Sequence, residues 1–456
     1  MSYTLRTYQE EAVRSALNAK KNELLVLPTG SGKSLVISEI ARSVSGRVLV
    51  LQPSKEILEQ NLEKLHAYDY YDVGVYSASM RRKDRGHITL ATVGSIHKRL
   101  DEFQDIELII IDEAHAVNPK GGMYKTVIET LGVQVIGLTA TPYRLHSYED
   151  FRSGQRAVVA KLLTRTRPRE FSGIAHITQV QELFSAGYLA MPEYHISEGY
   201  DHSEIKLNST GMDFDREALQ RYNEQMDVVG AVVEALNELD ARHILVFAVF
   251  VEEAVRIAEA LEHLGIRAVS ISADTGQRER DEIVRAFRAG EIQVVTNVGV
   301  LTTGFDYPEL DCVVMARPTQ SVALYYQMIG RGLRPYEGKT YHVVDVCGNV
   351  RRFGAVETFD FVETDTGLRL RSNAGYLTGF DFVNNEDLEA RDYRGKRETT
   401  GQNNNKIWHI GKHKGTHVSK LPQSYLEWVV DNFSDGAPRR MAEAELERRI
   451  LRHSSF

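Results

Sequence analysis

Residues 24–34 read LLVLPTGSGKS, and this stretch decides how the chain is expected to fold. Its four leading apolar residues predict a buried strand, and residues 34–44 have the apolar spacing of a helix. A glycine-rich turn between a strand and a helix is the context of a phosphate-binding loop, in which backbone N–H groups hold phosphate oxygens. The loop residues expected to contact a nucleotide are Thr29, Gly30, Ser31, Gly32, Lys33 and Ser34.

A second stretch, IIIDEAH at residues 109–115, ends a predicted strand with two adjacent carboxylates. In a nucleotide site, Lys33 would reach the β- and γ-phosphates of ATP, and the Ser34 hydroxyl would ligate Mg²⁺. Asp112 would complete the Mg²⁺ shell, while Glu113 would orient and deprotonate the attacking water. The pair of motifs therefore predicts hydrolysis of bound Mg-ATP.

Short aliphatic runs alternate with helical patterns twice along the chain. The expected strands are residues 24–27, 48–51, 88–91, 108–111 and 135–138, and then 244–248, 268–272, 293–296, 312–315 and 341–346. Helices are expected at residues 34–44, 55–66, 177–186, 251–263, 278–288 and 322–333. This alternation predicts an α/β fold of two tandem domains, each a parallel sheet with flanking helices.

The chain divides at the points where this alternation stops. We expect an ATP-binding domain at 1–150, a connecting or inserted segment at 151–240 and a second α/β domain at 241–355. Residues 356–405 read as a linker and irregular segment, since the aliphatic strands vanish and charged and polar runs replace them. Residues 406–456 carry both tryptophans, Trp408 and Trp428, and predict a small accessory module with a charged tail helix.

Composition excludes several classes of protein. The chain has 456 residues, 42% of them hydrophobic and 26% charged, which is typical of globular domains. No apolar run approaches the ~20 residues that span a bilayer, so no membrane partner is expected. The two cysteines form no CxxC pair, so neither a disulfide framework nor a structural zinc site is expected, and a cytoplasmic location fits. A net charge of −8 argues against coating nucleic acid by bulk charge, but allows a local basic groove.

In its motifs and their order, the sequence resembles a superfamily-two helicase with a DEAH box and two RecA-like domains. LRTYQ at residues 5–9 resembles the adenine-reading Q motif, which assigns Arg6 and Gln9 to ATP binding. TATP at residues 139–142 resembles the motif that links hydrolysis to strand movement, and TTGFD at residues 302–306 resembles a second-domain motif. The resemblance assigns Gly304 and Asp306 to ATP binding. The residues that it assigns to the nucleic-acid backbone are Pro53, Ser54, Lys55, Thr92, Ser95 and Thr302.

The last motif, QMIGRGLR at residues 327–334, supplies two arginines three residues apart. On a helix this spacing would place Arg331 and Arg334 on one face, where forked cations suit a γ-phosphate held by the other domain. An arginine finger of this kind is worth roughly 10³ to 10⁵ in rate. Gln327 and His115 are the expected pair that senses closure of the two domains.

Several short segments are similar to those of the RadD-like group of bacterial and phage DNA helicases, among them residues 300–306, 317–322, 330–334 and 345–349. Those relatives often end in a cysteine-rich zinc region, which this chain lacks. Residues 411–416 resemble a small GKYKG-type module. There Lys412, His413 and Lys414 would grip a phosphate beside Trp408, or simply form a solvated turn on a small core.

These observations favour an ATP-driven DNA helicase with Mg²⁺ as cofactor and a strand held through its phosphates. A duplex-DNA translocase that does not separate strands, or an RNA helicase, stays open as an alternative. An ATP-gated clamp without hydrolysis is disfavoured because Glu113, Lys33 and both arginines are present. A metabolic P-loop kinase is excluded, since it has no use for the second domain.

Overall fold

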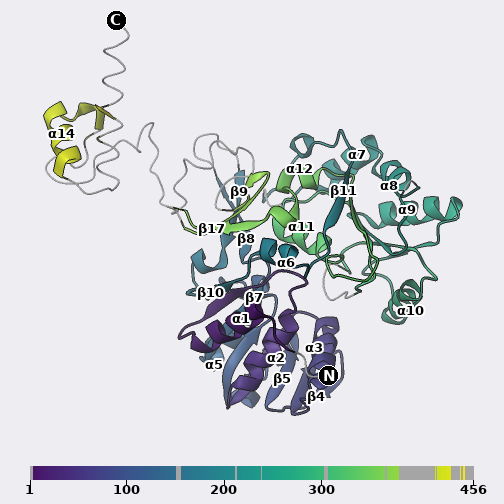
Figure 1. Ribbon diagram of the computed structural model, residues 1–456, viewed down its shortest axis with the longest axis horizontal. Coiled ribbons are helices and arrows are strands. Elements are labelled where there is room, and N and C mark those ends of the chain that lie inside the picture. The colour runs from purple at the N-terminus through teal and green to yellow at the C-terminus, as the bar shows by residue number, and fades with distance from the viewer. Residues whose placement is uncertain are drawn as a thin grey trace, which may run out of the picture. The chain divides into compact units, whose positions relative to one another are not determined.

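The stretch LLVLPTGSGKS contains most of β1 (Glu23–Val26), the loop after it and the start of the following helix, and β1 belongs to an eight-stranded sheet (Figure 1). The strand order is β10-β1-β7-β6-β2-β5-β3-β4, and all neighbours are parallel except β3 and β4. Its other strands are β2 (Arg47–Gln52), β3 (Val73–Ser77), β4 (Arg82–Lys83), β5 (Ile88–Thr92), β6 (Ile106–Ile111), β7 (Gln134–Thr139) and β10 (Gly173–Ile177). The central strands are aliphatic because both of their faces are covered.

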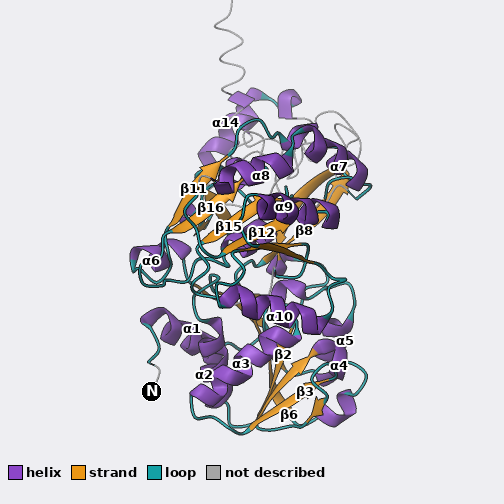
Figure 2. Cartoon of the chain, turned by 90° about the vertical axis from the view of Figure 1, so that its right-hand side faces the viewer, coloured by secondary structure: helices purple, strands orange, loops and turns teal. Residues whose placement is uncertain are grey.

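Helices cover both faces of this first sheet (Figure 2). One face packs against α1 (Thr7–Asn18), α2 (Lys33–Ser43) and α3 (Lys55–Ala67). The other packs against α4 (Val93–Ile96) and α5 (Met123–Leu131).

A second sheet, of six strands, is parallel throughout, with the order β11-β16-β15-β12-β14-β13. Its strands are β11 (Pro192–Ile196), β12 (Ile244–Ala248), β13 (Ala268–Ile271), β14 (Val294–Asn297), β15 (Cys312–Ala316) and β16 (Tyr341–Asp345). One face packs against α7 (Arg216–Gln225), α8 (Val228–Asn237) and α9 (Val251–His263). The other packs against α10 (Gln277–Arg288), α11 (Val322–Ile329) and α12 (Asn349–Phe353). The prediction of two domains with parallel sheets is therefore confirmed.

The segment between the two predicted domains adds an edge strand to each sheet. β10 pairs with β1, and β11 pairs with β16, with α6 (Val180–Ser185) between them. The sequence pattern did not predict these strands, because GIAHI and PEYHI mix polar side chains into half-exposed edges. The helix expected at residues 177–186 is correspondingly shorter, since Ile177 ends β10. An antiparallel hairpin, β8 (Tyr143–Glu149) and β9 (Arg156–Leu162), precedes β10.

The computed structural model describes residues 4–149, 156–210, 213–237, 239–301, 307–364, 367–378, 416, 418–432, 442, 445 and 446. A three-stranded sheet, β17 (Asp360–Val362), β18 (Arg369–Ser372) and β19 (Gly375–Tyr376), follows α12. A separate small unit contains α14 (Gln423–Asn432) and an apolar core of Val418, Leu421, Leu426, Val429 and Ala442. Within the described residues, no helix is long and apolar enough to cross a membrane.

Candidate active site

The predicted ATP-site motifs meet at the carboxyl edge of the first sheet. The phosphate loop follows β1, Asp112 follows β6, and Thr139 ends β7, and these three strands are neighbours in the order β1-β7-β6. Ligands of open α/β sheets bind outside the carboxyl ends of the strands. The next two strands, β2 and β5, bring residues 53–55 and Thr92 to the same edge, because Gln52 and Thr92 are register partners.

The phosphate loop is tied to the N-terminal motif by hydrogen bonds to one carbonyl. Gln9 Nε2 donates to the Ser31 carbonyl at 2.9 Å, and the Tyr8 hydroxyl donates to it at 2.6 Å. Gly32 lies in the left-handed region, with φ of +78°, and a Cβ there would lie 2.7 Å from Gln9 Nε2. The loop therefore needs glycine at this position for both its backbone and its packing.

Arg6 and Gln9 lie together at the start of α1. The Arg6 backbone N–H donates to Gln9 Oε1 at 2.9 Å, and the Arg6 guanidinium lies 3.8 Å from the ring centroid of Tyr188. A flat cation and a ring beside a side-chain amide are groups that can stack on and hydrogen-bond to a base. No motif in the sequence identified Tyr188, which follows α6 on the segment between the two sheets.

Glu113 lies between Lys33, which is predicted to reach the ATP phosphates, and His115, which is predicted to sense closure of the two domains. Its Oε1 lies 3.2 Å from Lys33 Nζ, and its Oε2 lies 3.2 Å from His115 Nδ1. His115 Nδ1 also lies 3.1 Å from Thr139 Oγ1 and 3.4 Å from Thr141 Oγ1. The phosphate loop, the DEAH sequence and the TATP sequence thus form one connected polar network.

The two adjacent carboxyl groups have pKa values shifted in opposite directions. Burial, and then the charge of Glu113, raise the pKa of Asp112 to about 6. Burial would also raise the pKa of Glu113, but Lys33 and His115 outweigh it and hold that pKa below its ordinary value. The backbone of Glu113 is itself strained, with φ of 52° in the left-handed region that non-glycine residues rarely adopt. Opposed environments for paired carboxyls are typical of sites that divide two chemical roles.

Three residues that the motifs did not identify surround these carboxyl groups. Asn61 Nδ2 donates to Asp112 Oδ2 at 3.5 Å, and Lys64 Nζ donates to Ser34 Oγ at 3.4 Å. Burial, and then the charges of Asp112 and Glu113, raise the pKa of Tyr124 to about 12. Asn61 and Lys64 share one face of α3, and their partners are the two predicted Mg²⁺ ligands, a relation that linear spacing could not reveal.

The residues present fit Mg-ATP. Among the described residues, Ser31 Oγ and Asn61 Oδ1 are buried without a hydrogen-bond partner. Buried polar atoms of this kind are normally satisfied, so each of them has capacity for a further partner. Ser34 and Asp112 offer the oxygen ligands that Mg²⁺ prefers.

The second domain reaches this network through α11. Gln327 Nε2 lies 3.3 Å from His115 Nε2. The amide donates to this nitrogen when the imidazole carries its proton on Nδ1, which faces Glu113 and Thr139. His115 therefore contacts both Glu113 and a residue of the second domain.

The expectation that Arg331 and Arg334 share one face of a helix is wrong. α11 ends at Ile329, and Gly330 caps it. Gly332 packs against the Tyr341 ring, so closely that a Cβ there would lie 1.9 Å from the ring, and the proline at 335 disfavours a helical residue before it. Both arginines are half-buried in the segment after the helix, and Arg331 Nε donates to the Gln327 carbonyl at 3.3 Å.

The start of this segment packs against the phosphate loop. A Cβ on Gly330 would lie 2.6 Å from Thr29 Cγ2, so the two backbones approach closely. The arginine-bearing motif thus begins beside the nucleotide site of the other domain.

The residues assigned to the nucleic-acid backbone occupy structural positions at the carboxyl edge. Ser54 caps α3 by accepting the Ile57 N–H at 3.4 Å, and Lys55 pairs with Glu59 at 3.3 Å. Thr92 Oγ1 and Ser95 Oγ lie 2.8 Å apart, and Pro53 is exposed directly after β2. Three further predicted residues, Thr302, Gly304 and Asp306, lie outside the described residues.

A basic cluster lies near the β8–β9 hairpin. Burial, and then the charges of Arg167, Lys120 and Arg165, lower the pKa of Lys161. These three positive charges repel that of Lys161, so an anion beside them would be attracted. The basic run at residues 165–169 was visible in the sequence, but its neighbours Lys120 and Lys161 were not.

Two family models match the chain. The model described as "Type III restriction enzyme, res subunit" matches residues 2–144, and "Helicase conserved C-terminal domain" matches residues 227–335. The first match contains β1 to β7 of the first sheet, and the second match contains β12 to β15 of the second sheet.

Curated relatives are similar over most of this chain. A 51.5 kDa protein of a Lactococcus phage is 28% identical over 73% of this chain and 67% of its own. The IRC3 protein of Saccharomyces cerevisiae, named as an ATP-dependent helicase, is 25% identical over 85% of this chain and 56% of its own. The "DNA 3'-5' translocase XPB2" of Sulfurisphaera tokodaii is 24% identical over 72% of this chain and 78% of its own. The chain therefore spans little more than half the length of the yeast relative.

Solved structures share the fold. A fragment of an HsdR subunit of a type I restriction enzyme from Vibrio vulnificus has a TM-score of 0.56 and 24% identity, over 77% of this chain and 66% of that one. The S. cerevisiae protein Dbp5 has a TM-score of 0.51 and 15% identity, over 75% of this chain and 83% of that one. The shared fold and the two family matches show that this chain has two RecA-like helicase domains, and the helicase family matches and relatives support an ATP-hydrolysing enzyme similar to the superfamily-two helicases.

Proposed function

We propose that this protein is an ATP-dependent DNA helicase. It couples Mg-ATP hydrolysis to translocation on DNA and to unwinding, in repair, recombination or replication. The observation that carries the proposal is the polar chain from Lys33 through Glu113 and His115 to Gln327. These side-chain contacts join the phosphate loop to the second domain. Movement of the second domain would therefore act on the residues that carry out hydrolysis.

Each residue of the network has a distinct role in hydrolysis. Ser34 and Asp112 would hold Mg²⁺, which would supply neutralisation of the β- and γ-phosphate charge. Lys33 exchanges its contact with Glu113 for the phosphates, and Glu113 then accepts the proton of the attacking water. Arg331 and Arg334 stabilise the charge of the transferred phosphoryl group, while Arg6 and Gln9 bind the adenine.

Nucleic acid is held across the carboxyl edge, beside the ATP site. Residues 53–55, Thr92 and Ser95 supply backbone contacts from β2 and β5, adjacent to the strands that carry the ATP site. The basic cluster of Lys120, Lys161, Arg165 and Arg167 supplies further contacts to phosphates. Contacts to phosphates rather than base edges give weak sequence preference and strong salt dependence.

A DNA translocase without strand separation is the second candidate. It is favoured by the similarity to the Sulfurisphaera protein, whose name describes a DNA 3'-5' translocase. Strand displacement on a forked duplex, compared with ATP consumption on the same duplex, distinguishes the two. A helicase separates the strands, whereas the translocase consumes ATP and leaves them paired.

The finer relationship is also a proposal. The DEAH sequence at residues 112–115 and the phrases at residues 300–306 and 345–349 support a DEAH-box motor of the RadD-like group. The GKYKG-like turn at residues 411–415 lies outside the described residues, so its contribution to DNA binding rests on its sequence alone.

The experiment that tests the proposal is ATPase activity titrated with single-stranded DNA, duplex, fork, Holliday junction and RNA. A DNA helicase should be stimulated by single-stranded or forked DNA at least about tenfold over RNA. Equal stimulation by RNA would overturn the choice of DNA. If none of these nucleic acids stimulates the ATPase activity, the proposal of a nucleic-acid motor fails.

A further inference from the structure

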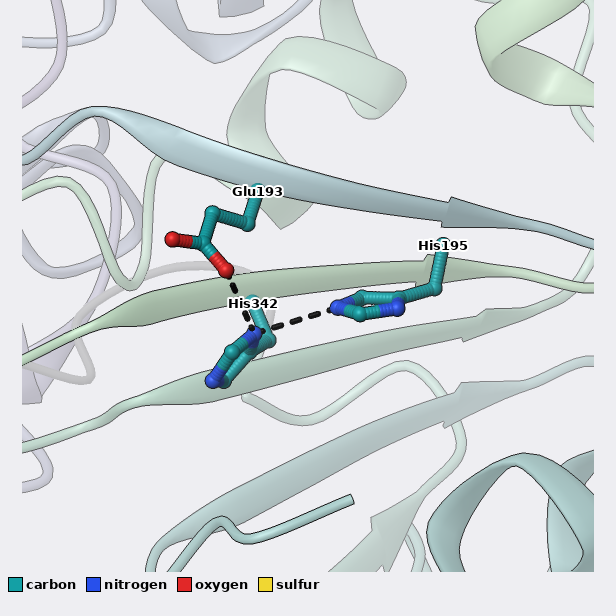
Figure 3. A group of neighbouring side chains, drawn as sticks. All are labelled: Glu193, His195 and His342. Carbon is teal, nitrogen blue, oxygen red and sulfur yellow. Dashed lines mark hydrogen bonds and ion pairs between the residues drawn. The ribbon is translucent and has the colours of Figure 1, made fainter. Parts of the chain in front are cut away.

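Three side chains with metal-binding atoms converge at the edge of the second sheet (Figure 3). β11 is the edge strand, and alternation along it places Glu193 and His195 on one face. Tyr194 points to the other face, where its hydroxyl donates to Glu357 at 2.8 Å. The register pairs Glu193 with His342 of β16, so all three side chains occupy adjacent positions of one surface.

The three donor atoms lie within 4.8 Å of one another, and two of the distances between them are close to those around one ion. His195 Nε2 lies 3.1 Å from His342 Nδ1, and His342 Nδ1 lies 3.7 Å from Glu193 Oε2. Ligands about 2.0–2.1 Å from a tetrahedral ion are about 3.3 Å from one another, which falls between these two distances. Two imidazole nitrogens at hydrogen-bond distance must share one proton, and a metal ion takes the place of that proton.

The surroundings keep His342 neutral and add negative charge near it. Burial, and then His195, lower the pKa of His342, while the charges of Glu193, Asp311 and Asp240 act on it in the opposite direction. A metal-binding imidazole must be unprotonated, and nearby carboxylates stabilise a bound cation. Asp311 is held by the backbone N–H groups of Arg242 and His243, both at 2.9 Å. The Glu193 side chain is 62% exposed, so an ion can reach the site from solvent.

We propose that Glu193, His195 and His342 form a binding site for a divalent transition-metal ion of the zinc class. Two imidazoles and one carboxylate suit Zn²⁺, Ni²⁺ or Cu²⁺ rather than Mg²⁺ or Ca²⁺, and three protein ligands leave one position for water. The site is separate from the Mg²⁺ ligands Ser34 and Asp112, which lie at the first sheet. It revises the expectation of no structural zinc, since the cysteine count bears on thiolate ligands and not on imidazoles.

The ion would link β11 to β16 through side chains of both strands. β11 is where the chain, after completing the first sheet with β10, enters the second sheet. An ion held by residues of both strands therefore fixes the point at which the connecting segment joins the second domain.

The test uses the full chain, stripped of metal with a chelator and titrated with Zn²⁺ or Co²⁺ alone, without nucleotide. We expect one equivalent to bind and the melting temperature to rise. His195→Ala and Glu193→Gln, both at exposed positions, should weaken binding at least tenfold and abolish the melting shift. The control His263→Ala, an exposed histidine in the last turn of α9, should bind like the wild type.

Bound Co²⁺ should also give the visible absorption of a four-coordinate ion, and His195→Ala should lose it. If the wild type binds no ion, the pair of histidines is only hydrogen-bonded and the proposal fails. If His195→Ala and Glu193→Gln bind one equivalent as tightly as the wild type, the ion lies elsewhere and the proposal also fails.

Discussion

Glu113 is held in a costly backbone conformation and between two basic groups. Its φ of 52° and its contacts with Lys33 and His115 fix the position of the carboxylate that we propose as the base. Strain of this kind persists only where surrounding structure determines it, and here the His115 network does so.

Glu113→Gln should therefore keep ATP binding but lose the base. We expect steady-state ATP turnover to fall by ~10² or more, while ATP affinity stays near that of the wild type and the protein stays bound to the strand. Phosphate release and binding of a fluorescent ATP analogue measure the two quantities. Glu129→Gln, which changes an exposed glutamate of α5, is the control. Turnover near the wild-type rate would remove Glu113 from the mechanism.

Asp112 gives a second residue-scale prediction, about stability. Its folded-state pKa of about 6 lies above the ordinary value of about 3.9, so the folded state binds the proton more tightly than the unfolded state. The buried charge therefore costs stability fully above pH 6 and not at all below about pH 4. Asp112→Asn should raise the melting temperature at pH 8 without Mg²⁺, and the difference should vanish near pH 4.

Differential scanning fluorimetry across that pH range measures this difference. The exposed Asp101→Asn should melt like the wild type at every pH. A melting temperature for Asp112→Asn equal to or below that of the wild type at pH 8 would contradict the raised pKa.

At the scale of elements, the basic cluster near the β8–β9 hairpin predicts where a nucleic-acid strand is held. Reversing two of its charges with Arg165→Glu and Arg167→Glu should weaken DNA binding and reduce the dependence of log affinity on log salt by about 2. Fluorescence anisotropy over a range of salt concentrations measures both. Arg14→Glu, at an exposed position of α1, should leave the salt dependence unchanged. An unchanged slope in the double variant would place the strand elsewhere.

The elements that could be predicted from sequence are those with a strong period. The helix expected at residues 251–263 is α9, because its apolar positions recur at helical spacing and lie buried on the second sheet. β1, β2, β5, β6 and β7 were predicted because they are buried on both faces and so uniformly aliphatic. β10 and β11 were missed because an edge strand needs no such run.

Motifs predicted the candidate site better than they predicted its local geometry. Lys33, Glu113, His115 and Gln327 lie together as expected. Lys33 begins α2, Glu113 and His115 follow β6, and Gln327 lies in α11, and each of these elements has a clear sequence pattern. The helix that was expected to continue to Arg334 was predicted too long. The apolar spacing continues past Gly330, but the helical backbone ends at Ile329. Asn61 and Tyr188 are far from the site motifs in the sequence and lie near them only in the folded protein, so no sequence motif could predict them.

At the scale of the whole molecule, the central claim is that ATP is hydrolysed between two domains. Gln327 already contacts His115, and the segment after α11 begins against Thr29 of the phosphate loop. Arg334 lies about 300 positions from Lys33 in the sequence, so its effect on hydrolysis depends on the closure of the two sheets around one nucleotide.

The most direct test is the ATPase rate of Arg334→Ala with and without single-stranded DNA. ATP binding should stay nearly intact, because Lys33, Ser34 and Gln9 remain. The stimulated rate should fall by ~10³, or about 4 kcal/mol of transition-state stabilisation, and stimulation by DNA should vanish. The control Arg351→Ala, an exposed arginine of α12, should keep both. Hydrolysis by Arg334→Ala at the wild-type stimulated rate would contradict the two-domain motor.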